Sequence, residues 1–218
     1  MKKQFAVIGL GRFGSSVCKE LYHLGHDVLA IDNDEVKLNG VSDYATHHVI
    51  TNATDESALK SLGIRNFDYV IVAIGDHIQS SILCTMLLKE IGVKKVWVKA
   101  QNDYHHKVLE KIGADRIVRP EHDMGIRVAH HLDSERIIDY IELSEDYSIV
   151  ELVATEKNNK QTLIEMDVRA KFGCTVLAIK RGSDVNISPS PMDEIVSEDI
   201  LVVMGHKNDL KRFEAEGM

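Results

Sequence analysis

The sequence of 218 residues is 44% hydrophobic and carries 34 acidic against 26 basic residues, a net charge of −8. Such an acidic balance argues against a protein that coats nucleic acid and against electrostatic binding to a membrane surface. No apolar run approaches the ~18 residues of a membrane-spanning helix. The start, Met-Lys-Lys-Gln-Phe, is expected to enter a strand directly and not to be a signal peptide. We therefore expect a cytoplasmic protein that reaches a membrane only through a partner.

The first 120 residues alternate short apolar runs with segments of helical spacing. Strands are predicted over 5–9, 27–32, 47–51, 69–75, 95–99 and 116–119. Helices are predicted between them, over 15–24, 34–42, 56–62, 77–91 and 103–112. This alternation predicts an α/β, Rossmann-like, doubly wound parallel sheet with helices on both faces.

After Pro120 the pattern changes. Residues 121–132 have helical spacing, and 137–141 are interpreted as a second helical or linking segment. Further strands are expected over 148–154, 175–179, 185–187 and 200–204, with helices over 162–171 and 208–216. The expected division is a nucleotide-binding domain over 1–120, crossover or linker helices over 121–143, and a small α+β lobe over 144–218.

Three cysteines, Cys18, Cys84 and Cys174, stand far apart among apolar neighbours. Neither a disulfide framework nor the CxxC spacing of a zinc site is present. We expect three buried free thiols in a reducing compartment.

The motif with the clearest chemistry is Gly9-Leu-Gly11-Arg-Phe-Gly14. It follows a strand, opens a helix, and precedes an acidic residue, Asp32, at the end of the next strand. In a dinucleotide-binding turn the three glycines allow the tight turn, the approach of a pyrophosphate, and close packing of helix on strand. The free N–H groups at the helix start favour phosphate. The alternative is a glycine-rich turn without a ligand.

The charges around this motif restrict the ligand. The acidic run Asp32-Asn33-Asp34 would repel a ribose 2′-phosphate, and no arginine stands beside Asp32, which disfavours NADP. NAD(H), ATP, ADP and AMP remain possible ligands. Arg12, inside the turn, has a planar guanidinium suited to phosphate, although it can equally be a solvated surface residue.

The motifs of enzymes that use such a fold are missing. No tyrosine is followed four residues later by the lysine of short-chain dehydrogenases, and neither HExxH nor GxSxG occurs. We expect a nucleotide-binding protein without catalysis. The alternative is an NAD-dependent oxidoreductase, or a redox sensor of NAD(H), with a minimal substrate lobe.

At this point the sequence resembles a known family, the RCK (regulator of potassium conductance) proteins, which combine a TrkA-N domain with a TrkA-C module. The N-terminal resemblance rests on residues 4–14, 52–55, 72–75, 99–101, 111–115 and 120–121, and the C-terminal one on 167–169, 177–182, 188–189 and 198–205. It covers essentially the whole chain and is strongest to the cytosolic gating subunits of bacterial Ktr potassium-uptake systems.

The resemblance implies a regulatory subunit with no nucleic-acid partner. Such subunits form homo-oligomers, expected to be octameric rings of dimers, on the inner face of the membrane beneath a potassium-translocating subunit of the Ktr or Trk type. Nucleotide binding changes the ring and gates the pore. The chemistry of the chain agrees, because it offers a nucleotide site without catalytic residues.

Motif and resemblance together give the expected ATP/ADP site, with NAD(H) as a further possible ligand. By resemblance the adenine lies at 52–54, and the loop after the fourth strand and the end of the fifth strand border the cleft. The site residues are Gly9, Gly11, Arg12, Phe13, Gly14, Asp32, Asn33, Asp34, Asn52, Ala53, Thr54, Ala73, Ile74, Gly75, Asp76, Lys99, Ala100, Gln101 and His105. For His105 a role in capping its helix is the alternative.

Two further sites are implied by the resemblance. Glu121 would bind Mg²⁺ or Ca²⁺ near the phosphates, between subunits; the alternative is a carboxylate that only stabilises the start of its helix. The C-terminal lobe would bind cyclic di-AMP at a lobe–lobe dimer interface; the alternative is a plain dimerisation lobe. The residues expected at this second site are Leu163, Ile164, Asp167, Val168, Arg169, Thr175 and Pro191.

Overall fold

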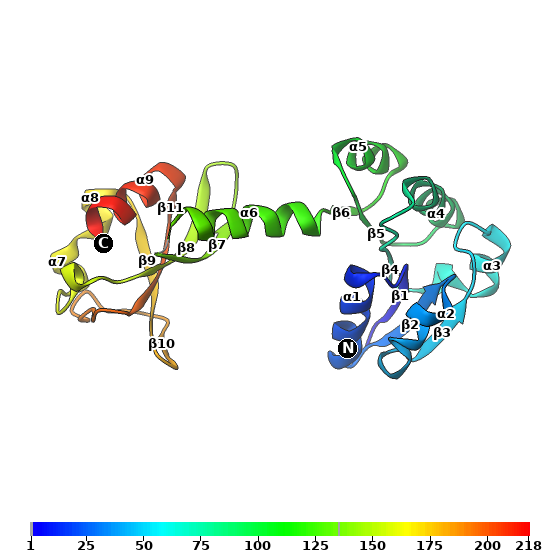
Figure 1. The fold of residues 1–218 in the computed structure, drawn as a ribbon, viewed down its shortest axis with the longest axis horizontal. Coiled ribbons are helices and arrows are strands. Elements are labelled where there is room, and N and C mark those ends of the chain that lie inside the picture. Colours follow the sequence, from blue (N-terminus) through cyan, green and yellow to red (C-terminus); the bar gives the residue numbers. More distant parts are fainter. Residues whose placement is uncertain (1, 135) are drawn as a thin grey trace. The chain divides into compact units, whose positions relative to one another are not determined.

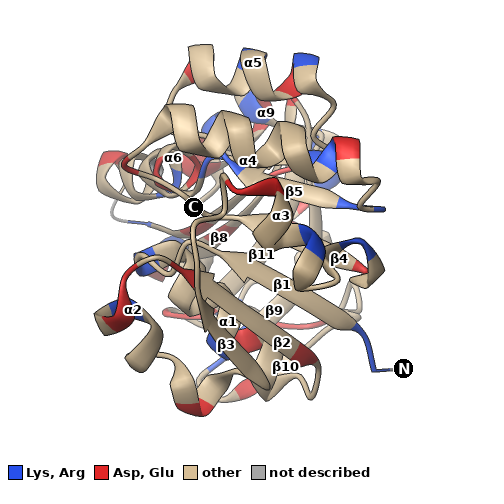
Figure 2. Cartoon of the chain, turned by 90° about the vertical axis from the view of Figure 1, so that its right-hand side faces the viewer, with Lys and Arg blue, Asp and Glu red and all other residues tan. Residues whose placement is uncertain are grey.

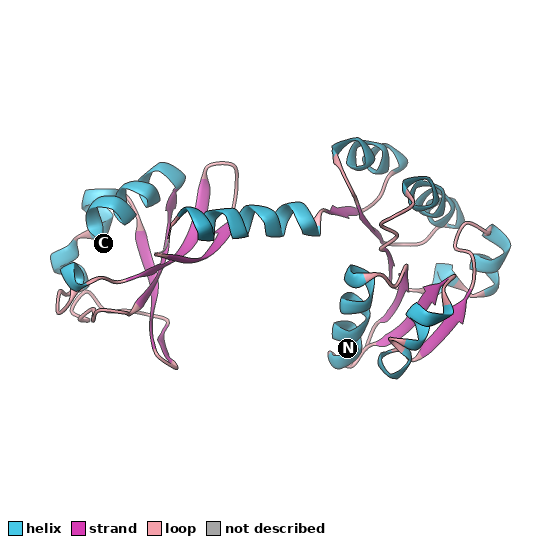
Figure 3. Cartoon of the chain, viewed as in Figure 1, coloured by secondary structure: helices cyan, strands magenta, loops and turns pink. Residues whose placement is uncertain are grey.

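The computed structural model describes residues 2–134 and 136–218. Contacts within the chain divide it into two compact units, Met1–Glu121 and His122–Met218. Each unit has its own sheet and its own hydrophobic core, and each is described separately below (Figures 1 and 3).

The first unit is built on a parallel sheet. Among the described residues it has six strands in the order β3-β2-β1-β4-β5-β6. The strands are β1 (Gln4–Ile8), β2 (Asp27–Asp32), β3 (His47–Ile50), β4 (Tyr69–Val72), β5 (Val96–Lys99) and β6 (Arg116–Val118). The order reverses between β1 and β4, where open α/β sheets bind ligands beyond the carboxyl ends of their strands.

Helices cover both faces of this sheet (Figure 3). They are α1 (Arg12–His23), α2 (Glu35–Asn39), α3 (Glu56–Ser61), α4 (Ile78–Ile91) and α5 (Asp103–Ile112), with 3₁₀ turns at Ser42–Tyr44 and Ile64–Asn66. Cys18 of α1 and Leu38 of α2 are buried in one core. Leu59 of α3, Leu88 of α4 and Leu109 of α5 are buried in the other. The predicted doubly wound fold is confirmed.

The second unit has an antiparallel sheet in the order β10-β9-β11-β8-β7. Its strands are β7 (Ile137–Glu142), β8 (Tyr147–Val153), β9 (Thr175–Arg181), β10 (Asp184–Asn186) and β11 (Ile200–His206). The helices of this part of the chain are α6 (Pro120–Asp133), α7 (Leu163–Met166), α8 (Val168–Phe172) and α9 (Lys207–Arg212), with a 3₁₀ turn at Glu156–Asn158 and a π-helical turn at Phe213–Gly217. This sheet and its helices form an α+β lobe, and its sheet includes β7 from the segment 121–143 that was expected to be a linker.

Three sequence-based predictions of local structure are wrong. Residues 137–141 are strand β7 and not a helical or linking segment, because they pair with β8 and bury Tyr140. The single helix expected over 162–171 is two short helices, separated where Asp167 takes a left-handed φ of 47°. Strand β4 ends at Val72, so residues 73–75 form a loop.

The surface helices carry charges of both signs, and the cysteines are buried. Asp103, Lys107, Glu110 and Lys111 alternate in sign along α5, and Figure 2 shows this mixture of charges on α4 and α5. All three cysteines are buried free thiols, as predicted, and burial raises the pKa of Cys84 to about 12. None of the helices within residues 2–134 and 136–218 combines the length and hydrophobicity needed to cross a membrane.

Candidate nucleotide site

The glycine turn closes α1 onto β1. Gly9 has a φ of +91°, and a Cβ atom placed on it would lie 2.9 Å from the backbone nitrogen of Ile74. A Cβ on Gly14 would lie only 1.9 Å from the carbonyl oxygen of Gly9. Gly11 differs, because a Cβ there would meet nothing within 4 Å. Gly9 and Gly14 are therefore required by the packing of the turn, whereas Gly11 leaves its backbone open to a ligand.

Asp32 is fixed beneath this turn at the carboxyl end of β2. One carboxylate oxygen accepts a hydrogen bond from the Leu10 backbone N–H at 2.6 Å, and the other accepts from the Asp34 N–H at 3.0 Å. The residue is 7% exposed. Because each carboxylate oxygen has a second lone pair, Asp32 can still accept hydrogen bonds from ribose hydroxyls.

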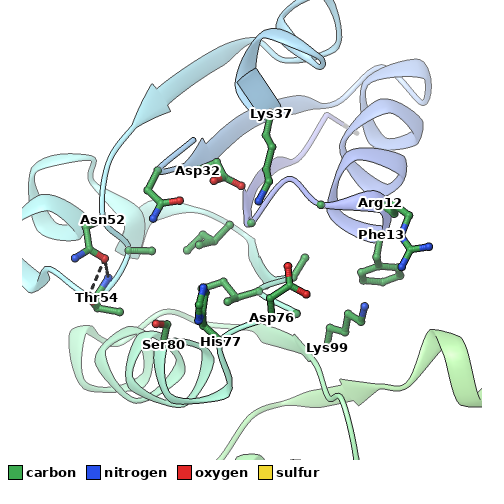
Figure 4. A pocket seen from close by; sticks show the side chains of 18 of the residues that line it. Arg12, Phe13, Asp32, Lys37, Asn52, Thr54, Asp76, His77, Ser80 and Lys99 are labelled. Atoms are coloured by element: carbon green, nitrogen blue, oxygen red, sulfur yellow. Dashed lines mark hydrogen bonds between the residues drawn. The ribbon is translucent and has the colours of Figure 1, made fainter. Parts of the chain in front are cut away.

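A cavity of about 350 Å³ opens above the turn at the carboxyl ends of the strands (Figure 4). The side chains shown come from both halves of the sheet, so segments far apart in the sequence share the site. The lining consists of Ile8, Gly9, Gly11, Arg12, Phe13, Asp32, Asn33, Lys37, Thr51, Asn52, Ala53, Thr54, Ala73, Ile74, Gly75, Asp76, His77, Ser80, Lys99 and Glu121.

One wall of the cavity is formed by the segment after β3. The Asn52 side-chain oxygen accepts hydrogen bonds from the Thr54 N–H at 3.0 Å and from the Thr54 hydroxyl at 2.8 Å. These two bonds fix the orientation of the Asn52 amide, and Figure 4 shows both residues at this wall. Ala53, between them, is 8% exposed. The arrangement gives a small apolar surface bordered by a fixed polar group, which suits an aromatic base.

The opposite wall carries cationic side chains. The Lys99 ammonium donates to the Glu121 carboxylate at 2.5 Å and lies 5.9 Å from the centre of the Phe13 ring. The hydrogen bond from Lys99 lowers the pKa of Glu121, and the positive charge of Arg12 acts in the same direction. Glu121 is therefore a carboxylate at neutral pH, and Arg12 and Lys99 place two cationic side chains on this wall.

Glu121 alone does not make a metal site. No group of three histidine, cysteine or acidic side chains that could hold a metal ion occurs in the described part of the chain. Among the described residues, the carboxylate of Glu121 forms its salt bridge with the Lys99 ammonium. A divalent cation would need Glu121 to leave Lys99 and would need further oxygen ligands, such as phosphate or a second subunit. Glu121 fits such a site as one ligand among several.

Five of the predicted residues do not line the cavity: Gly14, Asp34, Ala100, Gln101 and His105. Asp34 instead caps α2 by accepting from the Val36 N–H at 2.9 Å. His105 is 2% exposed, its Nδ1 accepts from the Gln101 N–H at 3.3 Å, and burial lowers its pKa. Residues 100–102 connect β5 to α5, and none of residues 100–105 lines the cavity. His105 is therefore a buried residue of the first turn of α5 that does not line the cavity.

Five lining residues were missed by the sequence analysis: Ile8, Lys37, Thr51, His77 and Ser80. Ile8 and Thr51 adjoin motifs that were recognised. Lys37 lies on α2, and His77 and Ser80 lie at the start of α4. Both helices follow strands that end at the cavity. These three residues could therefore have been predicted from their position at the first helical turn after such a strand.

In the second unit the structure brings part of the expected set together. The Ile164 N–H donates to the Pro191 carbonyl at 2.8 Å, so the loop around Pro191 lies against α7. Ile164 is 59% exposed beside it. Arg169 is exposed on α8 and Thr175 is half-buried at the start of β9, whereas Val168 is 5% exposed and packs in the core. Val168 therefore supports this surface from below and offers little contact area.

The sequence of this chain matches the models of two protein-domain families. The TrkA-N domain matches residues 5–120 and the TrkA-C domain matches residues 149–216. The chain belongs to the TrkA-N/TrkA-C family. The predicted relationship to RCK proteins is confirmed. The two matched segments lie in the parallel and antiparallel units respectively.

Full-length relatives narrow this family to potassium uptake. The chain is 62% identical to Ktr system potassium uptake protein A of Bacillus subtilis over 99% of this chain and 97% of the relative. It is 56% identical to protein C of the same system and organism, over 98% and 97%. Both relatives are potassium uptake proteins.

A solved structure of the GsuK RCK domain shares the fold. It matches with a TM-score of 0.70 and 15% identity, and covers 99% of this chain. This chain spans 47% of the length of that structure. At this identity the match supports the RCK fold.

Proposed function

We propose that this TrkA-N/TrkA-C chain is the gating subunit of a Ktr-type potassium-uptake system and that adenine nucleotides control it through the cavity above the glycine turn. The observation that carries the proposal is the position of Asp32, held by two backbone N–H groups beside an open Gly11 and facing a wall with Arg12 and Lys99. Asp32 would accept the ribose hydroxyls, residues 52–54 would contact adenine, and the start of α1 would bind phosphate.

Calorimetric titration of the full chain with ATP, ADP, AMP, NAD⁺, NADH and NADP⁺ tests this proposal. We expect ATP and ADP to bind and NADP⁺ to bind weakest, because Asp32 repels a 2′-phosphate. NAD(H) is the second candidate ligand, since the cavity continues beyond the phosphate side to residues 73–76. Failure of every nucleotide to bind would contradict the proposal, and hydride transfer between NAD(H) and a panel of alcohols or acids would favour the oxidoreductase.

Control of transport requires that a nucleotide bind two states of the assembly with different affinity, because a ligand that binds both equally shifts neither. The extra charge of the third phosphate, near Arg12, can supply that difference between ATP and ADP. We propose an octameric ring on the inner face of the membrane, beneath a potassium-translocating subunit. Native mass measurement with ATP and with ADP, together with co-purification of a polytopic potassium-transport subunit, tests the ring and the partner.

We further propose that the second unit binds cyclic di-AMP where two lobes meet. The family relationship supports this, as do the exposed Ile164 beside Pro191 and the exposed Arg169. A twofold-symmetric ligand suits a twofold interface, which presents each contact twice. Arg169 would pair with phosphate, Asp167 and Thr175 would give polar contacts, and Leu163 and Ile164 would give an apolar wall. The bound ligand would lock the lobes and inactivate transport.

Arg169→Ala is expected to weaken cyclic di-AMP binding about 10- to 100-fold, because a charge-assisted hydrogen bond to phosphate is lost. Calorimetry with cyclic di-AMP and, separately, with ATP measures this. ATP affinity should stay unchanged, since Arg169 lies in the second unit. Lys171→Ala, an exposed cation on the same helix, is the matched control. Equal loss from both variants would indicate a general charge effect, and no loss from Arg169→Ala would remove this site.

Glu121→Gln is expected to reduce the dependence of ATP binding on Mg²⁺, because glutamine keeps the shape of the side chain and loses the negative charge that a hard cation prefers. The measurement is ATP affinity over a Mg²⁺ titration in both proteins. Identical Mg²⁺ dependence would leave Glu121 as the partner of Lys99 only. Glu110→Gln, a surface carboxylate on α5 outside the cavity, should behave as wild type.

A further inference from the structure

Lys37 is a cation of the cavity that neither motif nor family resemblance points to. It lies in α2, which begins three residues after Asp32 at the end of β2. The residue is exposed at its helix and lines the cavity. Figure 4 shows its side chain extending from α2 into the cavity, on the side of Asp32, whereas Arg12 enters from the start of α1.

The charged side chains that line the cavity indicate that Lys37 can compensate the charge of an anionic ligand. Its lining carries three carboxylates, Asp32, Asp76 and Glu121, so a phosphate that enters needs compensating cations. Lys99 already pairs with Glu121 at 2.5 Å. Within the described residues, no salt bridge involves Lys37, and both oxygens of Asp32 accept from backbone N–H groups. Lys37 is thus a cation available to a ligand on the Asp32 side of the cavity.

We propose that Lys37 binds the first phosphate of the nucleotide, the one esterified to the ribose. The inference rests on the proposed nucleotide function. With the ribose hydroxyls on Asp32, the phosphate nearest the ribose lies between Asp32 and the glycine turn, which is where Lys37 reaches. Phosphates farther along the ligand lie toward Arg12 and Lys99. Lys37 therefore recognises any adenine nucleotide, and Arg12 distinguishes the number of phosphates.

Lys37→Gln tests this division of roles, with AMP, ADP, ATP and uncharged adenosine titrated into the full chain at low salt. We expect all three nucleotides to lose affinity by the same factor, about tenfold, because one charged hydrogen bond is lost in each complex. Adenosine affinity should not change. Arg12→Gln should weaken ATP more than ADP and ADP more than AMP. Lys60→Gln, an exposed α3 lysine paired with Glu56 outside the cavity, is the control.

The outcomes separate this inference from the proposed function. If the wild-type chain binds none of the nucleotides, the proposed function itself fails. If wild type binds them and Lys37→Gln does so equally well, the inference alone is overturned. A loss for ATP only would assign Lys37 to the terminal phosphate, and an equal loss for adenosine would assign it to the ribose or base; either result overturns it. The effect should shrink as salt rises, as expected for a screened, partly exposed charge pair.

Discussion

Asp32→Ala is expected to weaken ATP and ADP binding at least about 100-fold, because the ribose loses a charged acceptor for its hydroxyls and each such hydrogen bond is worth about 1.5–3 kcal/mol. The same change leaves the N–H groups of Leu10 and Asp34 without their acceptor. Leu10 is 2% exposed, so its unsatisfied N–H should lower the free energy of unfolding by about 1–3 kcal/mol. Calorimetry and thermal unfolding measure the two effects separately.

The neighbouring carboxylate provides a matched control. Asp34 caps α2 through the Val36 N–H and does not line the cavity. Asp34→Ala should therefore cost about 1 kcal/mol of stability through the lost cap and leave nucleotide affinity nearly unchanged. Equal loss of ATP affinity in both variants would contradict the ribose role of Asp32. The loss would then come from the removed negative charge or from a distortion of α2.

Much of the first unit could be predicted from sequence because its signals are local. The apolar runs fix the buried strands, and the spacing from Gly14 to Asp32 places the acid at the end of the second strand. Asp32, Asn52, Ala73 and Lys99 all follow or end parallel strands, so their meeting at one sheet edge follows from the topology. Which side chains then point into the cavity depends on helix orientation, which is why the sequence analysis missed Lys37 and why the predicted residue His105 lies outside the lining.

The errors in the second unit arise from contacts that are distant in sequence. The run from Ile137 to Ile141 has no decisive period, and only pairing with β8 makes it a strand. The break at Asp167 is equally hidden, because a left-handed aspartate costs energy that tertiary packing must offset. The local secondary-structure propensity of the sequence predicts neither the strand at 137–141 nor the break at Asp167. Fold class and domain content could therefore be predicted, while the arrangement of this lobe's candidate ligand surface needed the structure.

Gly14→Ala is expected to destabilise the first unit by about 3 kcal/mol, in the upper range for overpacking a close contact. Its Cβ would stand 1.9 Å from the Gly9 carbonyl oxygen, and both partners are backbone groups that a rotamer change cannot move. To relieve the overlap, α1 must shift away from β1 and open the phosphate-binding turn. Thermal unfolding should show a midpoint lower by about 10 °C, and ATP binding should be lost as well.

Gly11→Ala distinguishes the role of the turn in packing from its role in binding phosphate. Gly11 has φ −65° and ψ −172°, which alanine adopts without strain, and a Cβ there meets nothing within 4 Å. This variant should unfold at the wild-type temperature yet bind ATP at least about tenfold more weakly, because the methyl group occupies the space that a phosphate needs beside the backbone. If Gly11→Ala binds ATP as wild type does, phosphate does not approach the turn there. If Gly14→Ala is as stable as wild type, α1 can move away from β1 at little cost, and the 1.9 Å approach of the Cβ to the Gly9 carbonyl oxygen does not require glycine here.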